Sequence, residues 1–94
     1  MAVRGWKYNL PTDLSQQLRS AVYEGDTNTI VSAIEQALTW VVSTVPDLDE
    51  DDVYVRDIRD DLSFVDESST EEDIDYILSN FYDLCDTERV WIAI

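Results

Sequence analysis

Hydrophobic residues at helical spacing mark one stretch of this chain above all others, residues 28–45. Only Glu35 is ionised in it. At about 100° per residue, its apolar side chains fall on one wide face of a helix. They are Ile30, Ala33, Ile34, Ala37, Leu38, Val41 and Val45, with Val31, Trp40 and Val42 at the edges. We therefore predict a central core helix rather than a membrane span, which would need ~18 or more unbroken apolar residues.

The preceding residues, 12–24, carry a narrower apolar pattern. Leu14, Leu18, Ala21 and Val22 recur at helical spacing. We expect Thr12 or Asp13 to cap this helix and Gly25 to end it in the left-handed conformation. The central helix then follows after a short connection and ends before Pro46, so the two helices form a hairpin.

Residues 47–65 predict a third helix. Asp47 and Glu50 have the spacing of a capping box that would start it. Its apolar face consists of Leu48, Val55, Ile58, Leu62 and Val65. The β-branched alternation from Val53 to Val55 leaves a short strand open as an alternative at this point.

A fourth helix follows, with the clearest periodicity in the chain. The polar run before it is a strong helix start, with capping-box spacing at Thr70 and Asp73 or, alternatively, one residue earlier. Its apolar stripe consists of Ile74, Ile77, Leu78, Phe81 and Cys85. We expect the helix to end near Cys85.

Both ends of the chain alternate in the manner of strands. Trp6, Tyr8 and Leu10 share one side of residues 3–10, and Val90, Ile92 and Ile94 share one side of residues 89–94. Pro11 stops the first strand. Because an unpaired strand is unstable in water, we expect the two segments to pair with each other and lie on the helices. The predicted fold is α+β and mostly helical: one compact domain of residues 1–94, with a four-helix bundle-like core and a two-stranded antiparallel ribbon formed by the N- and C-terminal segments.

The composition indicates a folded chain with an unusual charge. Of the 94 residues, 45 % are hydrophobic, and the net charge is −15. That apolar content is too high for a disordered protein. Residues 47–75 hold fourteen acids against Arg56 and Arg59, a net charge of −12, whereas the rest of the chain carries −3. Salt adaptation would coat the whole surface, so this clustering favours a basic partner, with solubility or salt tolerance as the alternative.

The chain lacks the residues on which most catalytic sites depend. The chain has no His, which removes Ser-His-Asp and Cys-His arrangements and the commonest metal ligand. The acids lie in solvated runs rather than beside apolar groups that would raise a pKa. Cys85, the single cysteine, falls on an apolar face, and its lack of a partner fits a reducing compartment. We therefore expect that the protein is not an enzyme and that it has no catalytic residue and no cofactor.

Residues 47–58 match the pattern of a calcium-binding loop at some positions but not at others. Asp47, Asp49 and Asp51 match its first, third and fifth positions. The sixth position, which needs Gly for a sharp turn, is Asp52, and the twelfth, which needs a bidentate Glu, is Ile58. We expect no metal site.

The acidic run is therefore the feature that points to function. As one helix, residues 47–61 would extend ~22 Å. Their net charge of −6 is within about twofold of the charge of duplex DNA over that length. Tyr76, opposite the apolar stripe, is either an ordinary exposed tyrosine or an anchor of an interface. The predicted partner-binding residues are Asp49, Glu50, Asp52, Asp57, Asp60, Asp61, Glu71, Glu72, Asp75, Tyr76 and Asp83.

In size, charge and lack of catalytic residues, the chain resembles phage-encoded DNA mimics, including anti-restriction and anti-CRISPR inhibitors. The resemblance implies a protein that blocks a basic nucleic-acid-binding protein and does not itself bind nucleic acid. An immunity protein against a basic nuclease would use the same physics. The alternative is a small, non-inhibitory structural or assembly protein. No segment has the features of a targeting peptide, so we expect a cytoplasmic monomer or homodimer that does not bind membranes.

Overall fold

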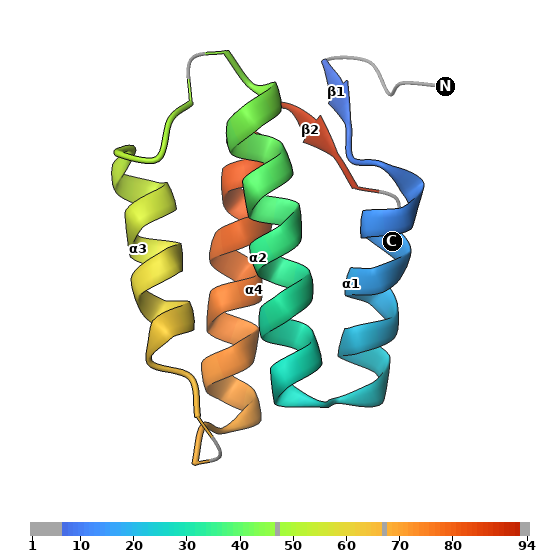
Figure 1. The fold of residues 1–94 in the computed structure, drawn as a ribbon, viewed down its shortest axis with the longest axis vertical. Coiled ribbons are helices and arrows are strands. Elements are labelled where there is room, and N and C mark those ends of the chain that lie inside the picture. The colour runs from blue at the N-terminus through green and yellow to red at the C-terminus, as the bar shows by residue number, and fades with distance from the viewer. Residues whose placement is uncertain (1–6, 47, 67, 93–94) are drawn as a thin grey trace.

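The computed structural model describes residues 7–46, 48–66 and 68–92, which form four helices and two short strands. In chain order these are β1 (Tyr8–Asn9), α1 (Thr12–Glu24), α2 (Thr27–Thr44), α3 (Val53–Ser63), α4 (Glu71–Thr87) and β2 (Val90–Trp91). Figure 1 shows that successive helices run in opposite directions. The prediction of a mostly helical fold with four helices is confirmed.

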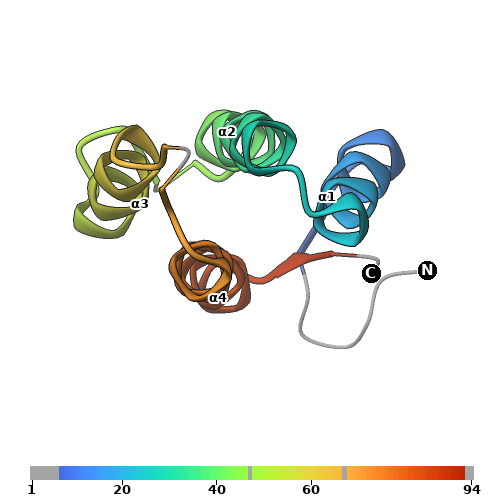
Figure 2. The same cartoon turned by 90° about the horizontal axis from the view of Figure 1, so that it is seen from below.

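The central place of α2 is also confirmed. It contacts α1, α3 and α4, and Figure 2 shows α1 and α3 on either side of it with α4 beneath. Every residue predicted for its apolar face is buried, and the three edge residues are half-buried. Within the described ranges, none of the helices combines the length and apolar character needed to cross a bilayer.

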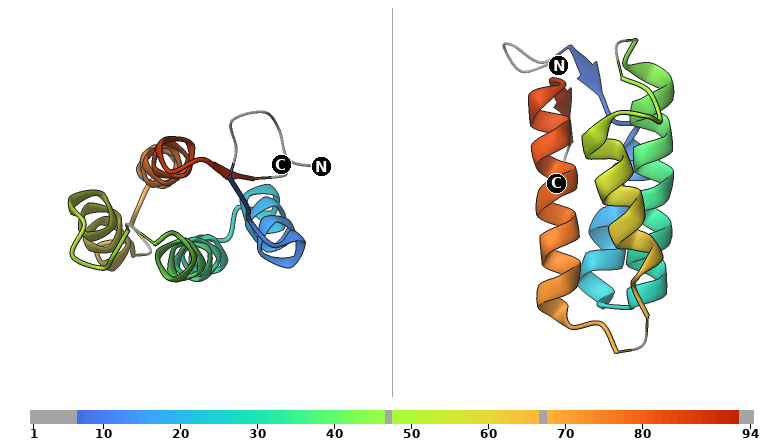
Figure 3. Two further views of the ribbon diagram at one scale, coloured as in Figure 1. Left: turned by 90° about the horizontal axis from the view of Figure 1, so that it is seen from above. Right: turned by 90° about the vertical axis from the view of Figure 1, so that its left-hand side faces the viewer.

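All four helices contribute to one apolar core. Leu18 of α1, Ile34 of α2, Ile58 of α3 and Phe81 of α4 are each at most 1 % exposed. The predicted stripe of α4 is buried throughout, and the helix continues for two residues past Cys85. This shared core holds α3 and α4 side by side, which Figure 3 shows from two directions.

The two strands pair in parallel, so the predicted antiparallel ribbon is wrong. Tyr8 lies opposite Val90, and the N–H of Leu10 donates to the carbonyl of Trp91 at 2.8 Å. The reason is chain direction. β1 continues into α1 in the same sense, whereas the chain reverses after α4 at Arg89, which has a left-handed φ of 60° (Figure 1). Residues 3–6, 93 and 94 of the predicted strands lie outside the described residues.

The third helix begins later than predicted. Leu48 is buried, but residues 48–52 form turns and α3 starts at Val53. The Oδ1 of Asp52 accepts a hydrogen bond from the N–H of Tyr54 at 2.9 Å, which caps the helix at that point. The helix start predicted near Glu50 is therefore wrong, and so is the strand alternative at residues 53–55. Asp47, the other residue of the predicted capping box, lies outside the described residues.

Of the other predicted helix ends, two are confirmed and one is wrong. Gly25 ends α1 with a φ of 74°, and its N–H donates to the carbonyl of Ala21. Thr70 and Asp73 form the predicted capping box of α4. The start of α1 was predicted incorrectly, because Pro11 is its N-cap and no side chain caps it.

Candidate functional site

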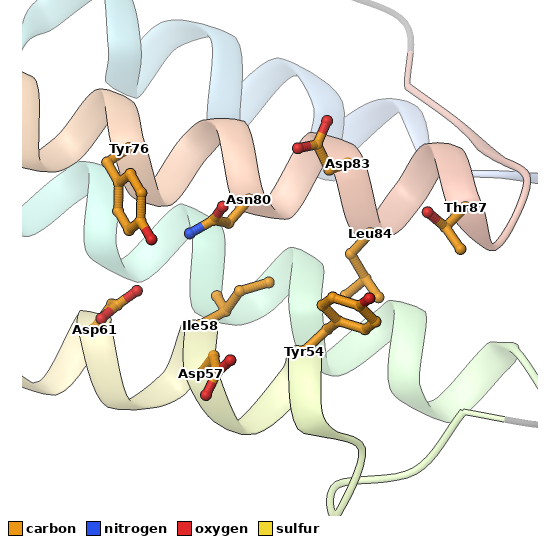
Figure 4. A pocket seen from close by; sticks show the side chains of 9 residues that line it. All are labelled: Tyr54, Asp57, Ile58, Asp61, Tyr76, Asn80, Asp83, Leu84 and Thr87. Carbon is orange, nitrogen blue, oxygen red and sulfur yellow. The ribbon is translucent and has the colours of Figure 1, made fainter.

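A groove with a volume of about 480 Å³ lies between α3 and α4. We call it the acidic groove. Figure 4 shows its lining residues, which are Tyr54, Asp57, Ile58 and Asp61 from α3 and Tyr76, Asn80, Asp83, Leu84 and Thr87 from α4. The spacing on α3 is that of one helix face, i, i+3, i+4 and i+7. The groove therefore follows from laying two helix faces side by side.

The floor of the acidic groove is apolar. Ile58 and Leu84 line it and also belong to the core, with 1 % and 3 % of their surfaces exposed. They are rigidly held because their other sides pack against core neighbours. A ligand in the groove would therefore contact an apolar base as well as polar walls.

Two tyrosines reach into the groove from opposite helices. Tyr54 projects from α3 toward Leu84, and Tyr76 projects from α4 toward α3 (Figure 4). The two residues remain 65 % and 63 % exposed, so both are accessible to a partner. A smaller hollow of about 270 Å³ adjoins the Tyr76 end and is lined in part by Phe64, which is 81 % exposed. Exposed aromatics thus extend along the whole of this face.

The charge of the groove is entirely negative. Asp57 and Asp83 lie at its rims and Asp61 points toward Tyr76 (Figure 4). None of the described residues that line it is basic. Arg59 instead forms an ion pair with Glu50, 3.7 Å between Nη2 and Oε1, on another side of α3. Both partners are exposed, so this pair contributes little to stability.

Four of the predicted partner-binding residues come together here: Asp57, Asp61, Tyr76 and Asp83. Glu71 and Asp75 line a different hollow, between α4 and the α1–α2 connection. Asp60 and Glu72 are exposed on α3 and α4 but do not line the groove. The predicted residues of α4 therefore divide between two faces of that helix, with Tyr76 and Asp83 at the acidic groove and Glu71 and Asp75 at the other hollow.

The predicted partner-binding residues that precede α3 form hydrogen bonds or an ion pair with nearby residues of the chain. Asp49 accepts a hydrogen bond from the N–H of Asp51 at 2.9 Å, Glu50 pairs with Arg59, and Asp52 caps α3. These contacts are exposed and weak, so the carboxylates still contribute to the local negative charge. Their first role in the structure is to shape the turn.

Sequence reasoning missed Tyr54, Asn80 and Thr87 as groove residues. Tyr54 was part of the ambiguous segment that suggested either a strand or a helix. Once α3 is helical, Tyr54 falls one turn before Asp57 and Ile58 on the same face. Asn80 falls one turn after Tyr76 in the same way, so helical spacing from Tyr76 would have identified it.

Three titratable groups outside the groove have pKa values shifted by burial or by hydrogen bonds within the fold. Burial raises the pKa of Cys85 to about 12, which keeps it a neutral, unreactive thiol. Burial also raises the pKa of Tyr82. Hydrogen bonds from the side chain and backbone of Ser68 lower the pKa of Asp66, in the turn between α3 and α4. Among the described residues, no three acids or cysteines are grouped closely enough to hold a metal ion.

The arrangement suits recognition of a cationic surface: the groove has an apolar floor, aromatic side chains from both walls and carboxylates, and none of the described residues that line it is basic. Comparison with known proteins adds no relative to this picture. No family model, no curated protein and no solved structure matches this chain.

Proposed function

We propose that this protein binds a basic nucleic-acid-binding protein through α3 and α4, and that it inhibits this partner by occupying the surface that nucleic acid would contact. The observation that carries the proposal is the acidic groove, where Asp57, Asp61 and Asp83 share the lining with two exposed tyrosines and none of the described lining residues is basic. Carboxylates in this setting attract cations without a competing internal partner.

The charge on α4 supports mimicry of a phosphate backbone. This helix carries six acids and no basic residue, and its 17 residues extend ~25 Å. Duplex DNA carries one charge per ~1.7 Å, roughly fifteen over that length. α4 alone therefore reaches a little under half the charge of DNA, and the carboxylates of α3 and its preceding turn add to it.

The overall charge also indicates the kind of partner. A chain with a net charge of −15 repels phosphates, so direct binding to nucleic acid is unfavourable. Association with a basic protein is instead accelerated by electrostatic steering and weakened by salt.

A competition experiment tests the proposal. The protein, tagged and immobilised, is used to capture basic DNA-binding or RNA-binding proteins from a host lysate at low salt, and each captured protein is then bound to labelled duplex or single-stranded nucleic acid. We expect the wild-type protein to displace the nucleic acid and to lose this ability as salt rises. The combined variant Asp57→Asn, Asp61→Asn and Asp83→Asn should displace it about tenfold less well, since each exposed ion pair contributes ~0.2–1 kcal/mol.

The matched control is the combined variant Asp13→Asn, Glu24→Gln and Glu35→Gln. It changes the net charge by the same amount, and all three residues are exposed on α1 and α2. This control should compete as well as the wild-type protein. Equal losses in both variants would show that the site is not the acidic groove. Capture of no basic protein would favour the non-inhibitory structural role instead.

A further inference from the structure

The tyrosines of the acidic groove carry an inference about what enters it. We propose that the groove binds an arginine-rich segment of the partner, with guanidinium groups stacked on Tyr54 and Tyr76 and paired with the carboxylates that line the groove. This proposal rests on the proposed function and specifies the chemistry of recognition. A flat acidic surface would accept any cation, whereas this groove has features that favour one.

The dimensions of the groove suit a short extended segment. Its lining runs from Tyr76 to Thr87 on α4, a length of ~16 Å at 1.5 Å per residue. An extended peptide of about five residues spans that distance. The volume of about 480 Å³ is that of a cavity that takes in side chains, comparable to the clefts that hold small ligands.

The walls favour arginine over lysine. A guanidinium group is planar, stacks on aromatic rings and can bind a carboxylate through two parallel hydrogen bonds. Tyr76 and Asp61 point toward each other across the groove, whereas Tyr54 points toward Leu84 and the carboxylate of Asp57 lies at the rim (Figure 4). One ring and one carboxylate are therefore available together at the Tyr76 end of the groove, and a second ring is available at the Tyr54 end.

The floor strengthens this preference. Ile58 and Leu84 offer an apolar base. A guanidinium loses less hydration there than an ammonium group, which is more strongly hydrated. Asn80 projects between the two tyrosines (Figure 4), and its amide oxygen can accept a hydrogen bond from an arginine side chain.

Titration of the full chain with two probe peptides tests this proposal. The probes are hexa-arginine and hexa-lysine, both with blocked ends, at low salt. We expect hexa-arginine to bind at least about threefold more tightly, since both probes carry the same charge and only the guanidinium stacks on the rings. Titration of ¹⁵N-labelled protein should shift the side-chain amide of Asn80 with hexa-arginine more than with hexa-lysine.

Five tyrosine substitutions test which rings produce this preference. Tyr54→Ala and Tyr76→Ala should each weaken hexa-arginine binding about two- to fivefold and leave hexa-lysine binding almost unchanged. Tyr54→Phe and Tyr76→Phe keep the ring and should retain the preference. Tyr23→Ala is the matched control, because Tyr23 is 92 % exposed on α1, away from the groove. It should change neither affinity.

Equal affinity for the two peptides, or equal effects of Tyr23→Ala and the groove substitutions, would overturn the proposal. Those results leave the proposed function intact as long as the protein still displaces nucleic acid from a basic partner. The opposite combination of results would also distinguish the arginine preference of the groove from the inhibitory function. Arginine preference without any displacement would support the chemistry of the groove and contradict the inhibitory role.

Discussion

The two halves of this chain share one core but differ sharply in charge. Residues 1–46 carry four acids and three basic residues, whereas residues 47–94 carry seventeen acids and three basic residues. The hollow on the outer face of α1 and α2 is lined by polar residues that are mostly uncharged, such as Gln17, Asn28 and Ser32. The hollow between α3 and α4 is lined by carboxylates and tyrosines.

This difference separates what builds the fold from what remains available for binding. Both halves bury comparable apolar side chains, such as Leu18 in α1 and Phe81 in α4. Packing therefore does not require the acidity of the second half. Adaptation to salt or a need for solubility would act on both halves, so the concentration of charge on α3 and α4 supports a local role for it.

The helix starts differ between the halves as well. α3 and α4 are capped by side chains, from Asp52 and from Thr70 with Asp73. No side chain caps the backbone at the start of α1 or α2. Part of the acidity of the second half thus serves local structure, and only the remainder is free for a partner.

The largest expected effect tests whether the halves form one cooperative unit. Phe81→Ala should lower the free energy of unfolding by about 3–5 kcal/mol, and Leu18→Ala by about 2–5 kcal/mol, because each leaves a cavity in the shared core. Urea unfolding followed by far-UV circular dichroism and by tryptophan fluorescence should give one coincident transition for each variant. Two separate transitions would show that the halves unfold independently and would contradict the conclusion that they share one cooperative core.

A smaller effect distinguishes the helix starts. Thr70→Ala should lower the free energy of unfolding by about 1 kcal/mol, since it removes the hydrogen bond from the Asp73 N–H to the Thr70 hydroxyl. Asp26→Ala should cost less, because the Asp26 side chain accepts only from the hydroxyl of Thr29 and from no backbone N–H of α2. Chemical denaturation of both variants in one buffer measures the difference. A larger loss for Asp26→Ala would contradict this assignment of the caps.

The smallest effect concerns repulsion within the acidic half. Asp75 lies four residues after Glu71 and three after Glu72 on α4, and like charges at this spacing destabilise a helix by ~0.2–0.5 kcal/mol per pair. Asp75→Asn should therefore raise the free energy of unfolding by about 0.5 kcal/mol at low salt. The gain should shrink at high salt because of screening. Glu35→Gln, in the nearly neutral half, is the control and should change stability little at either salt concentration.

The sequence by itself determined the elements of this fold and most of their buried faces. The apolar periodicity of α2 and α4 identified their core residues, Gly25 marked the end of α1, and Thr70 with Asp73 marked the start of α4. These features depend on residues within a few turns of one another, so local backbone geometry is enough to define them. The clustering of acids was equally visible in the sequence.

Tertiary structure decided how these elements lie with respect to one another. It buried Ser15 and left Val22 largely exposed on α1, made the ribbon parallel through the reversal at Arg89, and moved the start of α3 to Val53. It also brought Tyr54 and Asp57 opposite Asn80 and Leu84 while sending Asp75 to another face of α4. The strand pairing and the approach of α3 to α4 join residues far apart in the chain. Chain direction and packing against the shared core fix them, and helical spacing within a single segment contains no information about either.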